Sequence, residues 1–187
     1  MATSAKRLLT VDEFLQLEFS GDEGRRVELD NGTIRMMAGG SGEDARVQKN
    51  IFGLLFVGLR GSGCSPYGPD MGIRTHDLSL RYPDVSVFCG RDSEANDKLL
   101  EFDDPRVVVE VLSASTRDQD ERVKLHEYCA IASLQAIIYV DPDAETCRLL
   151  TRTGSRGWSD ETVAPGGTVT LAVLSVSLTW AEIFARS

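Results

Sequence analysis

Two strongly apolar segments of this chain each carry one acidic residue in their interior. Asp84 lies near the start of segment 82–89, and Glu110 stands among valines in segment 106–113. Both segments are rich in β-branched residues, which predicts buried β-strands. A carboxylate buried without a partner costs several kcal/mol, so each acid needs a compensating group, and a metal ion is one way to supply it. Two such acids in neighbouring strands therefore indicate a functional site.

The other elements are predicted from periodicity, caps and turns. Thr10 and Glu13 have capping-box spacing, and Asn31-Gly32 is typical of a tight hairpin turn. The expected helices are 11–18, 44–59, 117–132 and 180–186, and the expected strands are 26–29, 33–37, 71–75, 82–89, 106–113, 135–140, 146–151, 158–163 and 168–171. Strand 71–75 is expected beside 82–89, and 91–102 is expected to be a polar loop. This order predicts an α/β (α+β mixed) fold in which a central mixed β-sheet is flanked by helices.

Length and cysteine spacing limit the class of protein. With 187 residues, of which 42% are hydrophobic, the chain is long enough for a substantial core, and we expect a single domain over residues 1–187. The N-terminal segment has no long apolar run, so neither a secretory signal nor a membrane span is expected. The four cysteines, Cys64, Cys89, Cys129 and Cys147, include no CxxC pair. We therefore expect reduced, buried thiols, no zinc site and a cytoplasmic protein.

The two strand carboxylates predict a site for a hard divalent cation. Mg²⁺ or Mn²⁺ prefers oxygen ligands, so Asp84, Glu110 and a backbone carbonyl would suffice to hold it. Such an ion can polarise a phosphoryl oxygen and activate a bound water, which makes phosphodiester hydrolysis feasible. A nearby lysine would stabilise the developing charge. The position two residues after Glu110, on the same face of the strand, is Leu112, so the candidate is Lys124 in the following helix.

Several motifs occur in a characteristic order along the chain. They are Val27-Glu28-Leu29 with Gly32, Tyr82-Pro83-Asp84-Val85, Val109-Glu110-Val111-Leu112-Ser113 with Ser115-Thr116, then Asp120, Lys124 and Tyr128 at four-residue spacing, Val140-Asp141, and a closing Leu-x-Trp-Ala-Glu-Ile-Phe. This series is similar to that of the Uma2 family, restriction-endonuclease-like proteins of the PD-(D/E)XK nuclease superfamily. The resemblance covers nearly the whole chain.

The resemblance implies a fold and a set of roles. It implies a restriction-endonuclease-like core, with Asp84 and Glu110 as metal ligands and Val111 contributing its backbone carbonyl. Lys124 would replace the motif lysine, and Glu28 would be an accessory acid. The implied activity is that of a Mg²⁺- or Mn²⁺-dependent endonuclease acting on DNA, and the implied assembly is a homodimer.

Structural explanations compete with these roles for the two strand acids. Asp84 follows a proline at a strand start and could cap its own strand through local hydrogen bonds. Glu110 could form a buried ion pair with Arg106 or Arg81.

Simple ion pairs compete with the roles of the other two candidates. Asp120 and Lys124, at i,i+4 spacing, are typical of an exposed helix pair. Glu28 could pair across the hairpin with Arg35.

The formal net charge of −9 disfavours a protein that coats nucleic acid without specificity, because that binding depends on Lys and Arg neutralising phosphates. Three functions remain open. The first is the metal-dependent endonuclease. The second is a non-catalytic binding or interaction module that keeps the nuclease fold. The third is a metal-dependent hydrolase of another phosphorylated substrate.

Overall fold

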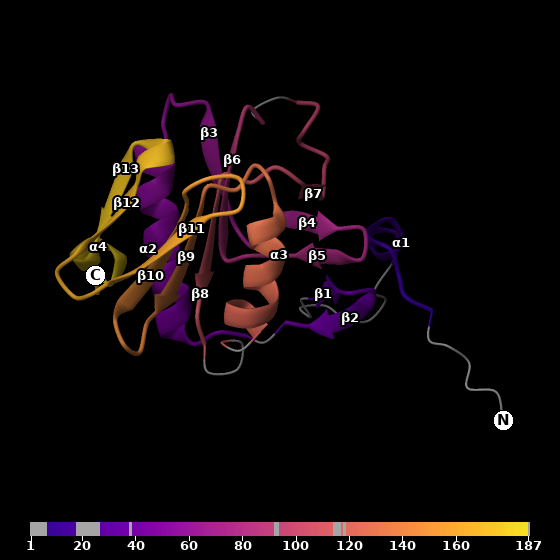
Figure 1. Ribbon diagram of the computed structural model, residues 1–187, viewed down its shortest axis with the longest axis horizontal. Helices are drawn as coiled ribbons and strands as arrows, with labels where there is room; N and C mark the ends of the chain where they lie inside the picture. Colours follow the sequence, from indigo (N-terminus) through magenta and orange to yellow (C-terminus); the bar gives the residue numbers. More distant parts are fainter. Residues whose placement is uncertain are drawn as a thin grey trace.

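A six-stranded mixed sheet forms the centre of the computed structural model, which describes residues 7–17, 27–37, 39–91, 94–113, 117 and 119–186 (Figure 1). Its strands, in spatial order, are β11 (Trp158–Val163), β10 (Thr146–Arg152), β9 (Ala136–Asp141), β8 (Val107–Val111), β6 (Val85–Cys89) and β3 (Cys64–Tyr67). Only the β8–β9 pair among them is parallel. The predicted mixed sheet with flanking helices is confirmed.

Alternating side chains of β8 divide the core into two layers. Val107 and Val109 face helix α2 (Gly42–Gly58), whereas Val108 lies in a second apolar cluster with Tyr128 of helix α3 (Leu125–Ala130). In Figure 1, α2 and α3 lie on opposite faces of the sheet. A strand covered on both faces has no solvated side, so the lone carboxylate in β8 lies in a buried position.

A second, five-stranded sheet packs beside the first. Its order is β2 (Thr33–Met36), β1 (Val27–Asp30), β5 (Ser79–Arg81), β4 (Gly72–His76) and β7 (Glu101–Phe102). The predicted hairpin turn is confirmed, since Asn31 and Gly32 both have positive φ, 46° and 74°. The expectation that 71–75 would pair with 82–89 is wrong, because β4 pairs with β5 and β7. The three-residue strand β5 was not predicted, and β7 lies at the end of the expected loop 91–102.

Helices α1 (Val11–Leu15) and α2 each begin directly after an N-cap residue that forms a capping box. Helix α1 has the predicted capping box, and α2 begins two residues before the expected Asp44 because Ser41 is its N-cap and Asp44 its third residue. The predicted helix 117–132 is a π-helical segment, η1 (Gln119–Lys124), followed by α3, and residues 114–116 and 118 of this region lie outside the described residues. The chain closes with β12 (Thr168–Leu171), η2 (Ala172–Leu174), β13 (Val176–Thr179) and α4 (Trp180–Ile183). Within the described residues, no helix has both the length and the apolar content needed to cross a membrane.

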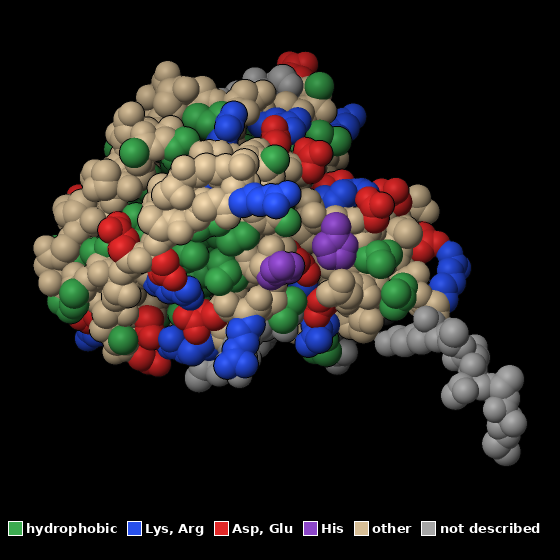
Figure 2. All heavy atoms as spheres, viewed as in Figure 1, with side chains coloured by type: hydrophobic (Ala, Val, Ile, Leu, Met, Phe, Trp, Pro, Cys, Tyr) green, Lys and Arg blue, Asp and Glu red, His purple; other side chains and the backbone are tan. Residues whose placement is uncertain are grey.

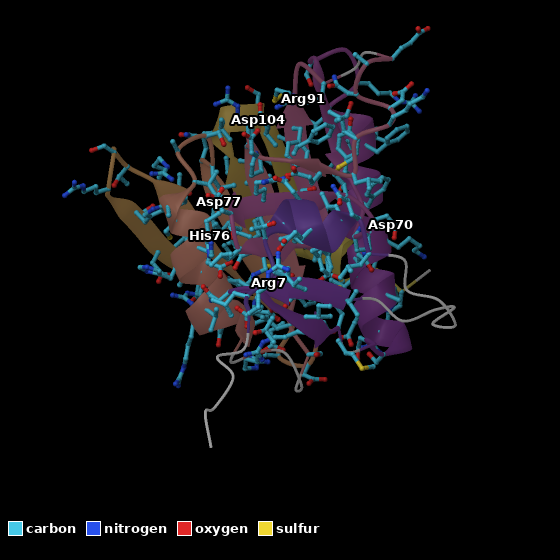
Figure 3. The ribbon with its side chains drawn as sticks, turned by 90° about the vertical axis from the view of Figure 1, so that its right-hand side faces the viewer. Arg7, Asp70, His76, Asp77, Arg91 and Asp104 are labelled. Atoms are coloured by element: carbon cyan, nitrogen blue, oxygen red, sulfur yellow. A yellow bond between two sulfur atoms is a disulfide. The ribbon has the colours of Figure 1, made fainter. Side chains whose placement is uncertain are left out.

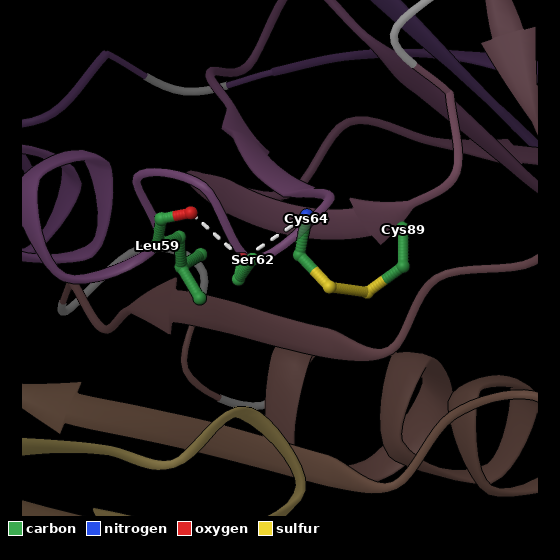
Figure 4. The surroundings of a disulfide bond; sticks show 4 residues. All are labelled: Leu59, Ser62, Cys64 and Cys89. Carbon is green, nitrogen blue, oxygen red and sulfur yellow. Dashed lines mark hydrogen bonds between the residues drawn. A yellow bond between two sulfur atoms is a disulfide. The ribbon is translucent and has the colours of Figure 1, made fainter.

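A disulfide joins Cys64 of β3 to Cys89 of β6 (Figure 4). The prediction that all four cysteines are free thiols was wrong for this pair. The two residues are 25 apart in sequence, but the antiparallel register of β3 and β6 places them directly opposite each other. Cys147 remains a buried free thiol and Cys129 a half-buried one.

Reducing this disulfide is expected to lower the free energy of unfolding by roughly 3 kcal/mol, from the loop-closure entropy of a loop of about this length. Urea unfolding with and without a thiol reductant measures the difference. The Cys64→Ser/Cys89→Ser protein is the control, because its unfolding should not respond to reductant. Equal stabilities of the oxidised and reduced wild type would contradict the bond's contribution.

Candidate active site

The candidate residues meet where β6 begins and β8 ends. Asp84 immediately precedes β6 and Glu110 is the fourth residue of β8, while Glu28 comes from β1 and Lys124 from η1. The C-terminal end of β8, the start of η1 and the β1–β2 hairpin all lie toward the lower part of the view in Figure 1. The antiparallel register pairs Val85 with Val109, and one further step along it sets Asp84 opposite Glu110.

Asp84 is bound to the neighbouring strand. Its Oδ2 accepts a hydrogen bond of 2.7 Å from the backbone N–H of Val111, and its own carbonyl accepts one of 3.0 Å from Gln48 of α2. This side-chain hydrogen bond therefore crosses between strands and is not the local cap considered as an alternative. Burial raises the pKa of Asp84 to about 6, although the Val111 N–H and the charge of Lys124 oppose this rise.

Glu110 is buried, with 3% of its surface exposed. Its Oε1 accepts a 2.7 Å hydrogen bond from the hydroxyl of Tyr128 and lies 3.2 Å from Nζ of Lys124. The buried ion pair considered as an alternative does exist, but its partner is this lysine. Burial raises the pKa of Glu110 to about 8; Lys124 opposes the rise, and the Asp120 and Asp84 carboxylates add to it.

Lys124 lies inside the protein, with 6% of its surface exposed. Its ammonium is 2.8 Å from Oδ1 of Asp120, 3.2 Å from Glu110 and 3.9 Å from Oε2 of Glu28. The expected i,i+4 pair with Asp120 is therefore present but buried, so the exposed-pair explanation fails. Burial alone would lower the pKa of Lys124, yet the three carboxylates outweigh it and raise the pKa, which keeps the amine charged.

The geometry of η1 and α3 brings two side chains to one carboxylate oxygen. A π-helical turn is rare and recurs at functional sites. Lys124 ends η1, and Tyr128, one helical turn later, reaches the same Oε1 of Glu110. Leu112, at the position where a lysine would be the direct solution, is buried in the apolar cluster around Tyr128.

Glu28 uses its two oxygens differently. Oε1 accepts a 3.0 Å hydrogen bond from Arg81, whereas Oε2 is buried and has no hydrogen-bond donor among the described residues. Arg35 lies opposite Glu28 in the hairpin register but forms its ion pair with Asp30, so the cross-hairpin pair considered as an alternative is not formed.

Sequence analysis considered Arg81 only as a possible ion-pair partner of Glu110. In the structure it is fully buried and bonds Glu28 instead. An arginine directly before Tyr82-Pro83-Asp84 in an apolar stretch was the available signal. His76, the last residue of β4 (Figure 3), is exposed and lies 3.8 Å from Glu127.

The donor set fits a hard divalent cation bound by few protein ligands. In the residues that the structure describes, no group of three or more His, Cys, Asp or Glu side chains could hold a metal ion. Mg²⁺ and Mn²⁺ need only one or two carboxylates, with waters and substrate oxygens completing the shell, so Asp84, Glu110 and the Val111 carbonyl are sufficient in kind. Two observations indicate a local shortage of positive charge: the buried Oε2 of Glu28 has no donor from any described residue, and the pKa values of Asp84 and Glu110 are raised.

Similarity to known proteins extends over almost the whole chain. The model of the Uma2 family, described as "Putative restriction endonuclease", matches residues 11–181. Two proteins of Synechocystis sp. are similar: "Uncharacterized protein sll1609" is 26% identical over 159 residues (84% of this chain, 89% of that protein), and "Uncharacterized protein slr1290" is 28% identical over 151 residues (80% and 77%). The crystal structure of "a putative nuclease belonging to DUF820" from Anabaena variabilis has a TM-score of 0.75 at 19% identity, with 95% of this chain and 98% of that chain covered. At that identity the likeness shows the fold.

Proposed function

This chain belongs to the Uma2 family of restriction-endonuclease-like proteins, and from that premise we propose that it is a Mg²⁺- or Mn²⁺-dependent endonuclease that hydrolyses phosphodiester bonds of DNA. The observation that carries the proposal is the buried contact of 3.2 Å between Lys124 Nζ and Glu110 Oε1, beside Asp84. In this contact Lys124, from the helical segment after β8, supplies the amine beside Glu110. Leu112, two residues after Glu110 in sequence, has no amine to supply.

The proposed roles follow from the charge and position of each group. Asp84 and Glu110, ionised, would hold the cation together with the carbonyl of Val111. The bound cation would polarise a phosphoryl oxygen and lower the pKa of a water in its shell. Because nearby carboxylates keep Lys124 protonated, this side chain would stabilise negative charge on the phosphoryl group or orient the water, and it would not accept the water's proton. Asp120 fixes the ammonium from its own helical segment.

A second candidate keeps the site but changes the substrate. The net charge of −9 disfavours extensive contact with a phosphate backbone. On the face shown in Figure 2, Lys and Arg side chains are interspersed with Asp and Glu along the lower edge. These two observations support a hydrolase of a smaller phosphorylated substrate, which is therefore the second candidate beside the endonuclease.

Incubation with supercoiled plasmid tests the first proposal. Wild-type protein with Mg²⁺ or Mn²⁺ should convert the plasmid to nicked and linear forms, and excess EDTA should stop the reaction. Hydrolysis of bis(p-nitrophenyl) phosphate with the plasmid left intact would support the second candidate. The absence of hydrolysis of either substrate with every metal and salt concentration would contradict both and leave the non-catalytic module.

A further inference from the structure

Arg81 lies at the centre of a second ionic cluster beside the candidate site. It is fully buried on β5, the middle strand of the five-stranded sheet. Its Nε and Nη2 bind both oxygens of Glu127 at 2.8 and 2.7 Å, Nη2 also binds Asp30 at 2.7 Å, and Nη1 binds Glu28 at 3.0 Å. One guanidinium therefore joins carboxylates from β1 and α3.

Two of these carboxylates are held from several sides. Glu127 also accepts a 2.9 Å hydrogen bond from the hydroxyl of Thr75. Asp30 also accepts a 3.1 Å hydrogen bond from the side chain of Asn31 and pairs with Arg35. Their additional bonds fix the guanidinium in one orientation, because its donors form a rigid planar fork.

Glu28 is the partner of which Arg81 binds only one oxygen. Arg81 binds Oε1. The buried Oε2 has no hydrogen-bond donor in the part of the chain that the structure describes, and it lies 3.9 Å from the ammonium of Lys124. Without the guanidinium, the Glu28 carboxylate would be repelled by the acids already paired with that ammonium, Glu110 and Asp120.

We propose that Arg81 is a positioning residue for the candidate site: by binding one oxygen of Glu28, it directs the other toward Lys124. Within the part of the chain that the structure describes, the side chain of Arg81 bonds to Glu28, Asp30 and Glu127 and not to the two proposed metal ligands or Lys124, so we infer that it acts through Glu28. This inference rests on the proposed function only for its kinetic test, since the orientation of Glu28 can be measured in an inactive protein.

Arg81→Lys is the informative variant. Lysine keeps the charge but cannot bind Glu127, Asp30 and Glu28 at once with a planar fork. In a crystal structure of the variant, the Glu28 carboxylate should turn away, so that its distance to Lys124 exceeds the present 3.9 Å. Arg152→Lys is the matched control, because Arg152 bonds the backbone carbonyls of Cys129, Ile131 and Leu134 and none of these site residues. Glu28 should be unchanged in the control, and an unchanged Glu28 in Arg81→Lys would overturn the proposal.

Kinetics supply the second readout. Arg81→Lys should lower kcat roughly ten- to a hundredfold through misplacement of the site. KM should be unchanged, because Arg81 bonds Glu28, Asp30 and Glu127 and none of the groups proposed to contact the phosphate. If Arg81 acts through Glu28, adding Glu28→Gln to Arg81→Lys should cause no further loss, whereas additive losses would overturn the proposal. If Arg81→Lys does not fold, Glu127→Gln replaces it, because this substitution weakens two hydrogen bonds from Arg81 and keeps a glutamate at position 28. The Glu28–Lys124 distance and kcat are then measured and interpreted in the same way. A wild type without activity would contradict the proposed function, and the crystal structures would still decide this inference.

Discussion

Replacing Lys124 with methionine is expected to lower the rate of plasmid cleavage by about 10²- to 10³-fold while leaving a folded protein that binds Mn²⁺. The ammonium is buried among Asp120, Glu110 and Glu28, so its removal takes away a fixed positive charge close to the proposed reaction centre. Methionine preserves most of the volume of the side-chain stem, which limits the packing loss. Metal binding should persist because the proposed ligands are retained.

Single-turnover cleavage of plasmid measures the rate, and titration calorimetry measures Mn²⁺ binding to the same preparation. Lys49→Met is the matched control, since Lys49 is exposed on α2 and its loss should not change the rate. Cleavage by Lys124→Met at the wild-type rate would show that the lysine is a structural partner of Glu110 and not part of the chemistry.

Replacing Glu110 with glutamine is expected to abolish Mn²⁺ binding and, at neutral pH, to stabilise the metal-free protein. The pKa of Glu110 is raised from an ordinary value of 4.5 to about 8 by burial, with Lys124 opposing the rise and Asp120 and Asp84 adding to it. Below pH 4.5 both the folded and the unfolded state carry the proton, and the free energy of unfolding is unaffected. Between pH 4.5 and about 8 the unfolded state loses it first, so stability falls as pH rises, by at most about 1.4 kcal/mol per pH unit.

Glutamine does not titrate, so the variant should lose this slope. Asp84, with its pKa raised to about 6, also makes stability fall as pH rises. It should therefore cause a smaller decline in the free energy of unfolding below that pH in both proteins. Urea unfolding in EDTA at about pH 5 and about pH 8 compares the variant with wild type and with Glu161→Gln, an exposed control on β11. If Glu110→Gln is less stable than wild type at the higher pH, the pair with Lys124 contributes more than burial costs.

Local patterns predicted much of the fold. The capping box at Thr10, the Asn31-Gly32 turn and the apolar spacing of α2 each depend on residues close together in sequence, and each prediction is confirmed. The family resemblance and the mixed sheet are confirmed as well. Local preference and the final fold agree in these segments.

Features that depend on long-range pairing were not predicted. The disulfide exists because β3 and β6 are in register, and β5 forms because β1 and β4 lie on either side of it. These strand pairings cannot be predicted from the spacing of Cys64 and Cys89. They cannot be predicted from the three residues of β5 either. Pairing between distant segments is decided by the whole fold.

The residues of the candidate site could likewise be predicted only in part. An acid within an apolar run is visible in sequence, so Asp84 and Glu110 could be selected as candidates, although β6 begins at Val85, one residue after Asp84. The burial of Lys124 could not, because i,i+4 spacing to Asp120 is the same for an exposed pair and a buried one. The hydrogen bond from Arg81 to Glu28 joins residues 53 apart in sequence. It forms only because β1 pairs with β5, so it could not be predicted from local sequence.

The assignment of Asp84 and Glu110 as metal ligands supports every catalytic role proposed above. Calorimetric titration of Mn²⁺ into the wild type and the Glu110→Gln protein tests it most directly. We expect saturable, stoichiometric binding to the wild type that disappears in the variant. Equal binding to both proteins, or no binding to the wild type, would contradict it.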